Sequence, residues 1–143
     1  MRTPLHESVT LCDLRALAEC DIQLAFRCLD ALAQALPPQQ VFPVLTSQLQ
    51  VYMSSGDARM RKSALMAFGV SVEGCSEYIR PHVDQLFPVI ESGLNDPEVI
   101  VRKAACIALG CLCEWLSEEC ATRHAVIVPV SRFYLSSSSA DCG

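Results

Sequence analysis

Apolar side chains recur along the chain at spacings of three and four residues, which is the period of an α-helix. In residues 60–75 and again in residues 101–116, one helix face collects the apolar and small side chains. The two sets are Met60, Ala64, Ala67, Phe68, Ser71, Val72 and Cys75, and Val101, Ala105, Ala108, Leu109, Leu112, Cys113 and Leu116. Further apolar residues on the flanks make each helix apolar almost all round, so the pattern predicts helices covered on both sides by neighbours.

The same pattern returns after 41 residues. RMRKSALMAFGVSVEGCSE (59–77) aligns with IVRKAACIALGCLCEWLSE (100–118), with eight identities in nineteen positions. The strings VFPV (41–44), LFPV (86–89) and IVPV (127–130) repeat at spacings of 45 and 41 residues and each place proline in an apolar helix. A period of about 40 to 47 residues with two helices per unit is typical of HEAT repeats. The sequence therefore predicts an all-α HEAT-repeat α-solenoid, a superhelix of antiparallel helix pairs, present as a partial array.

The repeat divides the chain into six expected segments. They are a poorly defined lead (1–20), the second helix of a partial repeat (21–38), two complete repeats (39–78 and 79–120), a stub of a further repeat (121–131) and a serine-rich tail (132–143). The tail SRFYLSSSSADCG departs from the repeat and has the composition of a disordered segment.

One string in the second repeat resembles the HEAT consensus closely. DPEVIVRKAACIALG (96–110) has the consensus aspartate, the Val-Arg pair and the Ala-Leu-Gly string. In that consensus an aspartate and an arginine of successive units form a hydrogen-bonded ladder, which the resemblance assigns to Asp96 and Arg102. The first repeat keeps the arginine as Arg61 but has Ser55 at the aspartate position, so a ladder contact is not expected of Ser55.

A narrower resemblance covers residues 21–130. The sequence from RKSALMAFGV to HAVIVPV is similar to the importin-beta (karyopherin-beta) family of nuclear transport receptors, and within it to the beta-4 group in its fungal form. Family members have about twenty HEAT units. The resemblance implies a segment of a receptor that carries basic cargo, such as ribosomal proteins or histones, through the nuclear pore. The implied partners are basic protein cargo, the phenylalanine-glycine (FG) repeats of nucleoporins, and Ran-GTP, the last through regions mostly absent from this chain. The implied location is the cytoplasm and the nucleus.

Two pairs of acidic residues are the candidates for cargo binding. Glutamates four residues apart share a helix face, and the 41-residue repeat stacks the pairs on neighbouring units. The resemblance implies that second helices line the inner surface and receive basic segments there. The candidates are Glu73, Glu77, Glu114, Trp115, Glu118 and Glu119. The competing interpretation is a solvated helix end with Trp115 packed in the core.

The first helices of each unit are expected on the outer side, where the resemblance implies grooves for FG repeats. The apolar residues there are Phe42, Leu45, Leu49, Leu86, Phe87 and Ile90. Packing in the core is the competing interpretation for all six.

Charge and composition exclude several other classes. Eleven Lys and Arg against sixteen Asp and Glu give a net charge of −5, the wrong sign for neutralising nucleic-acid phosphates. The longest runs without charge or proline in the apolar region, 63–72 and 104–113, have ten residues and are too short to span a bilayer. The first twenty residues lack the apolar core of a secretory signal. Neither nucleic acid nor a membrane is an expected partner.

The nine cysteines are expected to be reduced core residues, because the count is odd and no secretory signal accompanies them. Cys106, Cys111, Cys113 and Cys120 with His124 suggest a metal cluster by composition only, because the tight C-x-x-C spacing of a zinc site is absent. No nucleophile–histidine motif, phosphate-binding loop or paired-carboxylate motif is present. We expect no enzyme, no cofactor and no metal. The main alternative to an import receptor is a HEAT scaffold for another assembly, of the phosphatase or chromosome-complex type.

Overall fold

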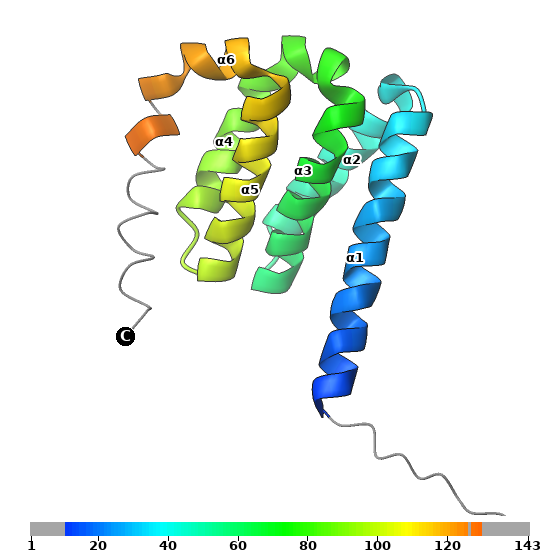
Figure 1. The fold of residues 1–143 in the computed structure, drawn as a ribbon. Helices are drawn as coiled ribbons and strands as arrows, with labels where there is room; N and C mark the ends of the chain where they lie inside the picture. Colours follow the sequence, from blue (N-terminus) through cyan, green and yellow to red (C-terminus); the bar gives the residue numbers. More distant parts are fainter. Residues whose placement is uncertain (1–10, 126, 130–143) are drawn as a thin grey trace, which may run out of the picture.

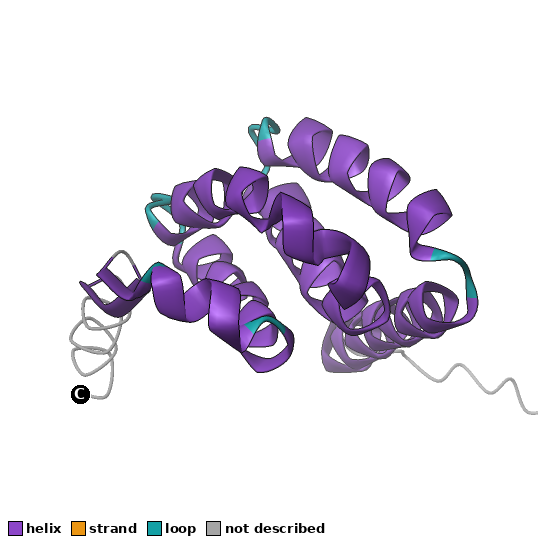
Figure 2. Cartoon of the chain, turned by 90° about the horizontal axis from the view of Figure 1, so that it is seen from above, coloured by secondary structure: helices purple, strands orange, loops and turns teal. Residues whose placement is uncertain are grey.

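The computed structural model describes residues 11–125 and 127–129, and these residues form helices joined by short loops. The helices are α1 (Leu11–Ala35), α2 (Pro38–Met53), α3 (Ala58–Ile79), α4 (Val83–Leu94), α5 (Val99–Trp115) and α6 (Ser117–Thr122), with one 3-10 turn, η1 (Arg80–His82). No strand occurs in this part of the chain (Figure 2). The prediction of an all-α HEAT solenoid is confirmed.

The helices lie in two layers. Helices α1, α3 and α5 stand side by side in one layer, and α2 and α4 form a second layer behind them (Figure 1). The pairs α2–α3 and α4–α5 are the two antiparallel units that the 41-residue repeat predicts. Helix α1 begins at Leu11, which is ten residues before the position expected from the sequence. The serine-rich tail lies outside the described residues.

Turn chemistry sets the helix boundaries. Pro38 opens α2, where its missing N–H costs no helical hydrogen bond. Asp57 caps α3, because its Oδ1 accepts a hydrogen bond from the backbone N–H of Arg59 at 2.9 Å. Pro43 in α2 and Pro88 in α4 occupy the sixth position of their helices. Because proline has no backbone N–H, both helices of the second layer lack the helical hydrogen bond at the same position.

The core runs between the two layers and along the whole array. Its fully buried side chains come mainly from α3, α4 and α5, and they include Phe68, Leu65, Ile79, Ile90, Leu112 and Leu116. Most of the predicted apolar faces are buried. Met60 is the exception, since 42% of it is exposed at the side of α3 that faces α1.

The layer of α1, α3 and α5 is the more closely packed of the two. A Cβ added to Gly69 of α3 would lie 3.3 Å from the Cα of Ala108 in α5, so the backbones of these helices almost touch. In the other layer α2 and α4 share few contacts, and aromatic side chains stand between them, with the rings of Phe42 and Tyr78 5.5 Å apart. A closely spaced layer backed by a wider one curves toward the closer layer. We therefore call α1, α3 and α5 the inner layer and their solvent-exposed side the inner face.

Candidate functional site

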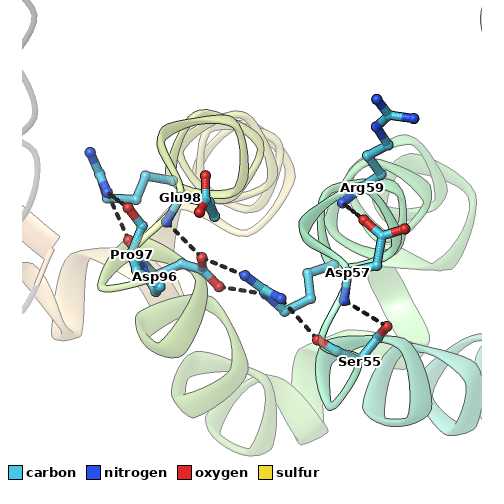
Figure 3. Close-up of polar contacts among 8 residues, drawn as sticks. Ser55, Asp57, Arg59, Asp96, Pro97 and Glu98 are labelled. Carbon is cyan, nitrogen blue, oxygen red and sulfur yellow. Dashed lines mark hydrogen bonds and ion pairs between the residues drawn. The ribbon is translucent and has the colours of Figure 1, made fainter.

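The two repeats are joined by a buried ion pair. Arg61 in α3 donates from Nε to Oδ2 of Asp96 at 2.7 Å and from Nη2 to Oδ1 at 2.9 Å, a bidentate contact between consecutive repeats (Figure 3). Only 13% of the Arg61 side chain and 8% of Asp96 are exposed. Asp96 also accepts a hydrogen bond from the backbone N–H of Glu98 at 2.9 Å, which anchors the start of α5. The carboxylate of Asp96 therefore links the two repeats and holds the backbone at the start of α5.

Each of the two repeat arginines also binds the loop before its own helix. Arg61 donates from Nη1 to the carbonyl of Ser55 at 2.8 Å, and Arg102 donates from Nη1 to the carbonyl of Asp96 at the same distance. Only the carbonyl of residue 55 is needed for this contact, so serine at this position does not disturb it. The pairing of Arg61 runs forward to Asp96 of the next repeat. A contact of Arg102 with the carboxylate of a following unit stays a prediction.

The ion pair makes stability depend on pH in the acid range. The hydrogen bond from Arg61 holds the pKa of Asp96 below its usual value of 3.8, although burial acts in the opposite direction. A lowered pKa stabilises the folded state at pH values above the usual aspartate pKa, and this stability is lost as the pH falls through the folded-state pKa. We expect the melting temperature to fall as the pH drops below about 4, and to fall less steeply in Asp96→Asn. Thermal melts followed by circular dichroism between pH 7 and pH 2.5 measure this; parallel curves for the two proteins would contradict it.

The predicted acidic residues gather at one end of the inner layer. Glu73 and Glu77 lie on α3, Glu114 lies near the end of α5, and Glu118 lies in α6, all of them exposed. The prediction that Glu114 and Glu118 share one helix face is wrong. Helix α5 ends at Trp115, and the next residue leaves the helical conformation with φ −129° and ψ 48°. We call Glu73, Glu77, Glu114 and Glu118 the acidic rim.

Glu119 differs from the acidic rim because it is held in an ion pair. Only 20% of its side chain is exposed, and its Oε1 accepts a hydrogen bond from Nη1 of Arg80 at 2.5 Å. The pKa of Glu119 is lowered by its own backbone N–H and by Arg80, against the effect of burial. Arg80 also lies 3.4 Å from Glu77, so it partly neutralises one member of the acidic rim. The sequence did not indicate this partner, which is 39 residues away from Glu119.

Trp115 is 42% exposed, so the interpretation of this side chain as packed in the core is wrong. It is the only tryptophan of the chain and directly follows Glu114 of the acidic rim. A partly exposed indole is able to cover the aliphatic stem of a lysine or the plane of a guanidinium.

The outer layer carries a separate groove between α2 and α4. It encloses about 260 Å³ and is lined by Phe42, Pro43, Thr46, Tyr78, His82 and Val89, among others. Of the six apolar residues considered for FG repeats, Leu45 is half-buried and the others are buried in the core. Phe42, Leu49 and Leu86 are among the residues that line the groove. Tyr78 and His82, which the sequence did not single out, contribute more of its exposed surface.

Cys75 and Cys120 are buried in the core and Cys106, Cys111 and Cys113 are half-buried against it, whereas Cys28 is exposed, so the prediction of a core cysteine is wrong for Cys28. Burial raises the pKa of the thiols of Cys75 and Cys106, and burial together with the neighbouring Cys113 raises the pKa of Cys120 to about 12. Within the described ranges, no three His, Cys, Asp or Glu side chains gather as a metal site requires. None of the described helices is both long enough and apolar enough to cross a bilayer.

Comparisons with known proteins match this geometry. A family model described as a HEAT-like repeat matches residues 58–112, which cover α3, α4 and most of α5. The chain is 36% identical over 112 residues to the probable importin subunit beta-4 of Schizosaccharomyces pombe, which covers 78% of the chain and 10% of that protein. It is 29% identical over 126 residues to importin-4 of Homo sapiens, covering 87% of the chain and 12% of the relative. Over 91 residues it is 25% identical to transportin of Dictyostelium discoideum, which covers 63% of the chain and 10% of the relative.

No solved structure matches the chain. The chain spans about a tenth of the length of the curated relatives it matches. The repeat, the two-layer helical array and the relatives named importin and transportin agree with one another. The chain belongs to the importin-beta family of HEAT-repeat proteins.

Proposed function

We propose that the chain is part of a nuclear import receptor and that its acidic rim binds basic segments of protein cargo. The observation that carries the proposal is the placement of Glu77 and Glu114 in the last turns of α3 and α5. The C-terminal end of a helix carries a partial negative charge, so a glutamate there costs about 0.3 to 1 kcal/mol. The exposed contact of Glu77 with Arg80 offsets only part of this cost, so fold stability alone does not explain these side chains, whereas the attraction of a basic ligand does.

The geometry adds two supports to the proposal. Parallel helices α3 and α5 bring their negative ends to the same edge of the inner layer, so the helix dipoles reinforce the field of the acidic rim. Trp115 lies beside Glu114 and gives the aliphatic part of a lysine or arginine an apolar surface. Arg80 pairs with both Glu77 and Glu119, so it reduces the negative charge that Glu77 offers to a basic ligand.

We further propose that the outer layer contacts FG repeats during passage through the nuclear pore. The groove between α2 and α4 exposes Tyr78, His82 and Val89 on the opposite side of the array, where weak contacts with FG repeats leave the acidic rim free for cargo. Control by Ran-GTP is assigned to parts of the receptor outside this chain. A protein with these partners moves between the cytoplasm and the nucleus, and it needs no catalytic group or cofactor.

The test uses Trp115 as an intrinsic probe in a titration with a lysine- and arginine-rich localisation peptide. We expect saturable binding that weakens as salt rises from 50 to 300 mM, because exposed charges are screened. Glu114→Lys with Glu118→Lys is expected to weaken binding about tenfold at low salt, equal to about 1.4 kcal/mol. Both side chains are exposed and neither contributes to the Arg80 pair, so the fold should be preserved.

The matched control is Glu91→Lys with Glu98→Lys. It changes the net charge by the same amount, but Glu91 lies on α4, and Glu98 is the N-cap residue of α5, at the other end of this helix from Glu114. Equal weakening by both double variants would show a response to net charge alone and would contradict a binding site at the acidic rim. An affinity that does not change with salt concentration would instead favour a HEAT scaffold with a non-basic partner.

A further inference from the structure

The inner face carries a repeated order of charged and apolar side chains on α3 and α5. Each helix presents a lysine, then two apolar residues, then a glutamate, all at the same spacing. The residues are Lys62, Met66, Val70 and Glu73 on α3, and Lys103, Ile107, Cys111 and Glu114 on α5. We call Lys62 and Lys103 the basic row, and Met66, Val70, Ile107 and Cys111 the apolar band.

These side chains share the solvent-facing side of their helices. Positions separated by three, four, seven and eleven residues lie on one helix face. The lysines and glutamates are exposed, Ile107 is 51% exposed, and the other members of the apolar band are half-buried. The band continues toward α1, where Leu24 is 59% exposed and Cys28 is exposed. The band therefore runs roughly perpendicular to the helices, with positive charge along one side and negative charge along the other on α3 and α5, while α1 adds apolar side chains without a lysine or glutamate at the equivalent positions.

An apolar hollow adjoins this band between α1 and α3. It encloses about 360 Å³, with Phe26 and Leu29 in one wall, Ala64 and Ala67 in the other, and Leu49 of α2 in the floor. Ala67 in the α3 wall directly follows Met66 of the apolar band, so the hollow and the band are neighbours along α3.

The repeat explains why the hollow is empty at this interface and filled at the next. Leu65 is fully buried, and its Cδ1 lies 2.8 Å from where a Cβ of Gly93 would be, so it fills the equivalent space between α3 and α5. Aligning LAF (24–26) with MAF (66–68) places Gln23 at the position of Leu65. Gln23 is exposed, so no side chain of α1 fills the space. The hollow therefore includes the space that an aliphatic side chain at position 23 would fill.

We propose that the inner face binds an amphipathic α-helix that has an apolar stripe, basic residues on one flank and acidic residues on the other. This inference rests on the proposed function and adds that the ligand is bipolar. The basic row and the glutamates lie eleven residues apart on each helix, which is about 16 Å at 1.5 Å per residue. A helix about 10 to 12 Å wide fills this distance once charged side chains extend from its two flanks. An extended strand does not, because its side chains alternate between opposite faces.

The length of the ligand follows from the array. Neighbouring helix axes lie about 8 to 10 Å apart, so the band from α1 to α5 extends about 20 Å. A helix of about 13 residues covers this length at 1.5 Å per residue. One apolar side chain of its stripe enters the hollow between α1 and α3, and the remainder of the stripe covers Met66 and Ile107. Its basic flank faces Glu73 and Glu114, and its acidic flank faces the basic row.

The probe is a labelled 14-residue synthetic helix with a leucine stripe, lysines on one flank and glutamates on the other. Fluorescence anisotropy with the 143-residue chain measures its affinity. We expect it to bind at least tenfold more tightly than a scrambled peptide of the same composition. Met66→Ser with Ile107→Ser is expected to remove this advantage, and Ile107→Ser alone to reduce it, with circular dichroism confirming that each variant is folded.

The basic row separates this inference from the proposed function. Lys62→Glu with Lys103→Glu is expected to weaken the bipolar helix at least fivefold and to strengthen the purely basic localisation peptide. If the bipolar helix binds no better than its scrambled form, or if the lysine variants strengthen both peptides alike, the inference is wrong and the proposed function stands. If the basic peptide also fails to bind the unaltered chain, the proposed function is wrong as well.

Discussion

Replacing Asp96 with alanine is expected to lower the free energy of unfolding by about 3 kcal/mol, because the substitution leaves a largely buried arginine without its partner. Asp96 accepts two hydrogen bonds from Arg61 and one from the backbone N–H of Glu98, and it is 8% exposed. Its removal therefore breaks the ion pair between two repeats and loosens the start of α5. Urea unfolding followed by circular dichroism measures the effect.

Two variants show which part of this loss belongs to the ion pair. Asp96→Asn keeps the acceptor for the N–H of Glu98 but loses the charge, so its loss should be smaller than that of Asp96→Ala. Asp57→Ala removes an aspartate that caps α3 and makes no contact between repeats, and it should cost about 1 kcal/mol. Equal losses in Asp96→Ala and Asp57→Ala would mean that Asp96 acts only at the helix start.

Replacing Gly74 with alanine is expected to destabilise the chain by about 2 to 3 kcal/mol through the contact of α3 with α1. An added Cβ would overlap the backbone carbonyl of Ala33 and would lie 2.8 Å from the backbone nitrogen of Gln34. These are main-chain atoms of a helix, so they cannot move aside as a flexible side chain does. Relief requires α1 to shift as a whole, which also alters the hollow between α1 and α3.

Gly110→Ala is the matched control for this substitution. Gly110 lies inside α5, is exposed, and has nothing within 4 Å of an added Cβ. Alanine there should stabilise the chain by up to about 1 kcal/mol, because glycine is a poor helix former. Opposite signs for the two substitutions in urea unfolding are the expected result. A stabilised Gly74→Ala would mean that α1 is not held against α3 as the structure shows.

Much of the fold was predictable because it depends on local periodicity. The spacing of apolar residues gave the positions of α3 and α5, and the 41-residue repeat gave their equivalence. The break after Trp115 was not predictable, since neither glycine nor proline marks it. Leu116 is fully buried at that point, and α6 begins at the next residue. Packing of one side chain against the core therefore separates Glu118 from the face of Glu114.

The candidate site was predictable in its residue types and less so in their roles. The repeat identified Glu73, Glu77, Glu114 and Glu118, whereas the sequence left open whether Trp115 is exposed or packed in the core. Glu119 has the same residue type and sequence neighbourhood, yet it is held by Arg80 of the turn η1, 39 residues earlier in the chain. The apolar hollow was not anticipated either, because it depends on the absence of a large side chain at Gln23 relative to Leu65.

The amino-acid sequence was enough to predict the helices α3 and α5, the pairing of helices into HEAT units, the family, and the acidic and basic residues at fixed intervals. These properties depend on periods of a few residues or on a repeat that aligns one unit with the next. The packed structure was needed to show that Arg61 pairs with Asp96, that Glu119 is held while Glu118 is exposed, and that charged and apolar side chains line up across α3 and α5. Each of these depends on packing between helices, because residues 35 and 39 positions apart along the chain meet only after the array has packed.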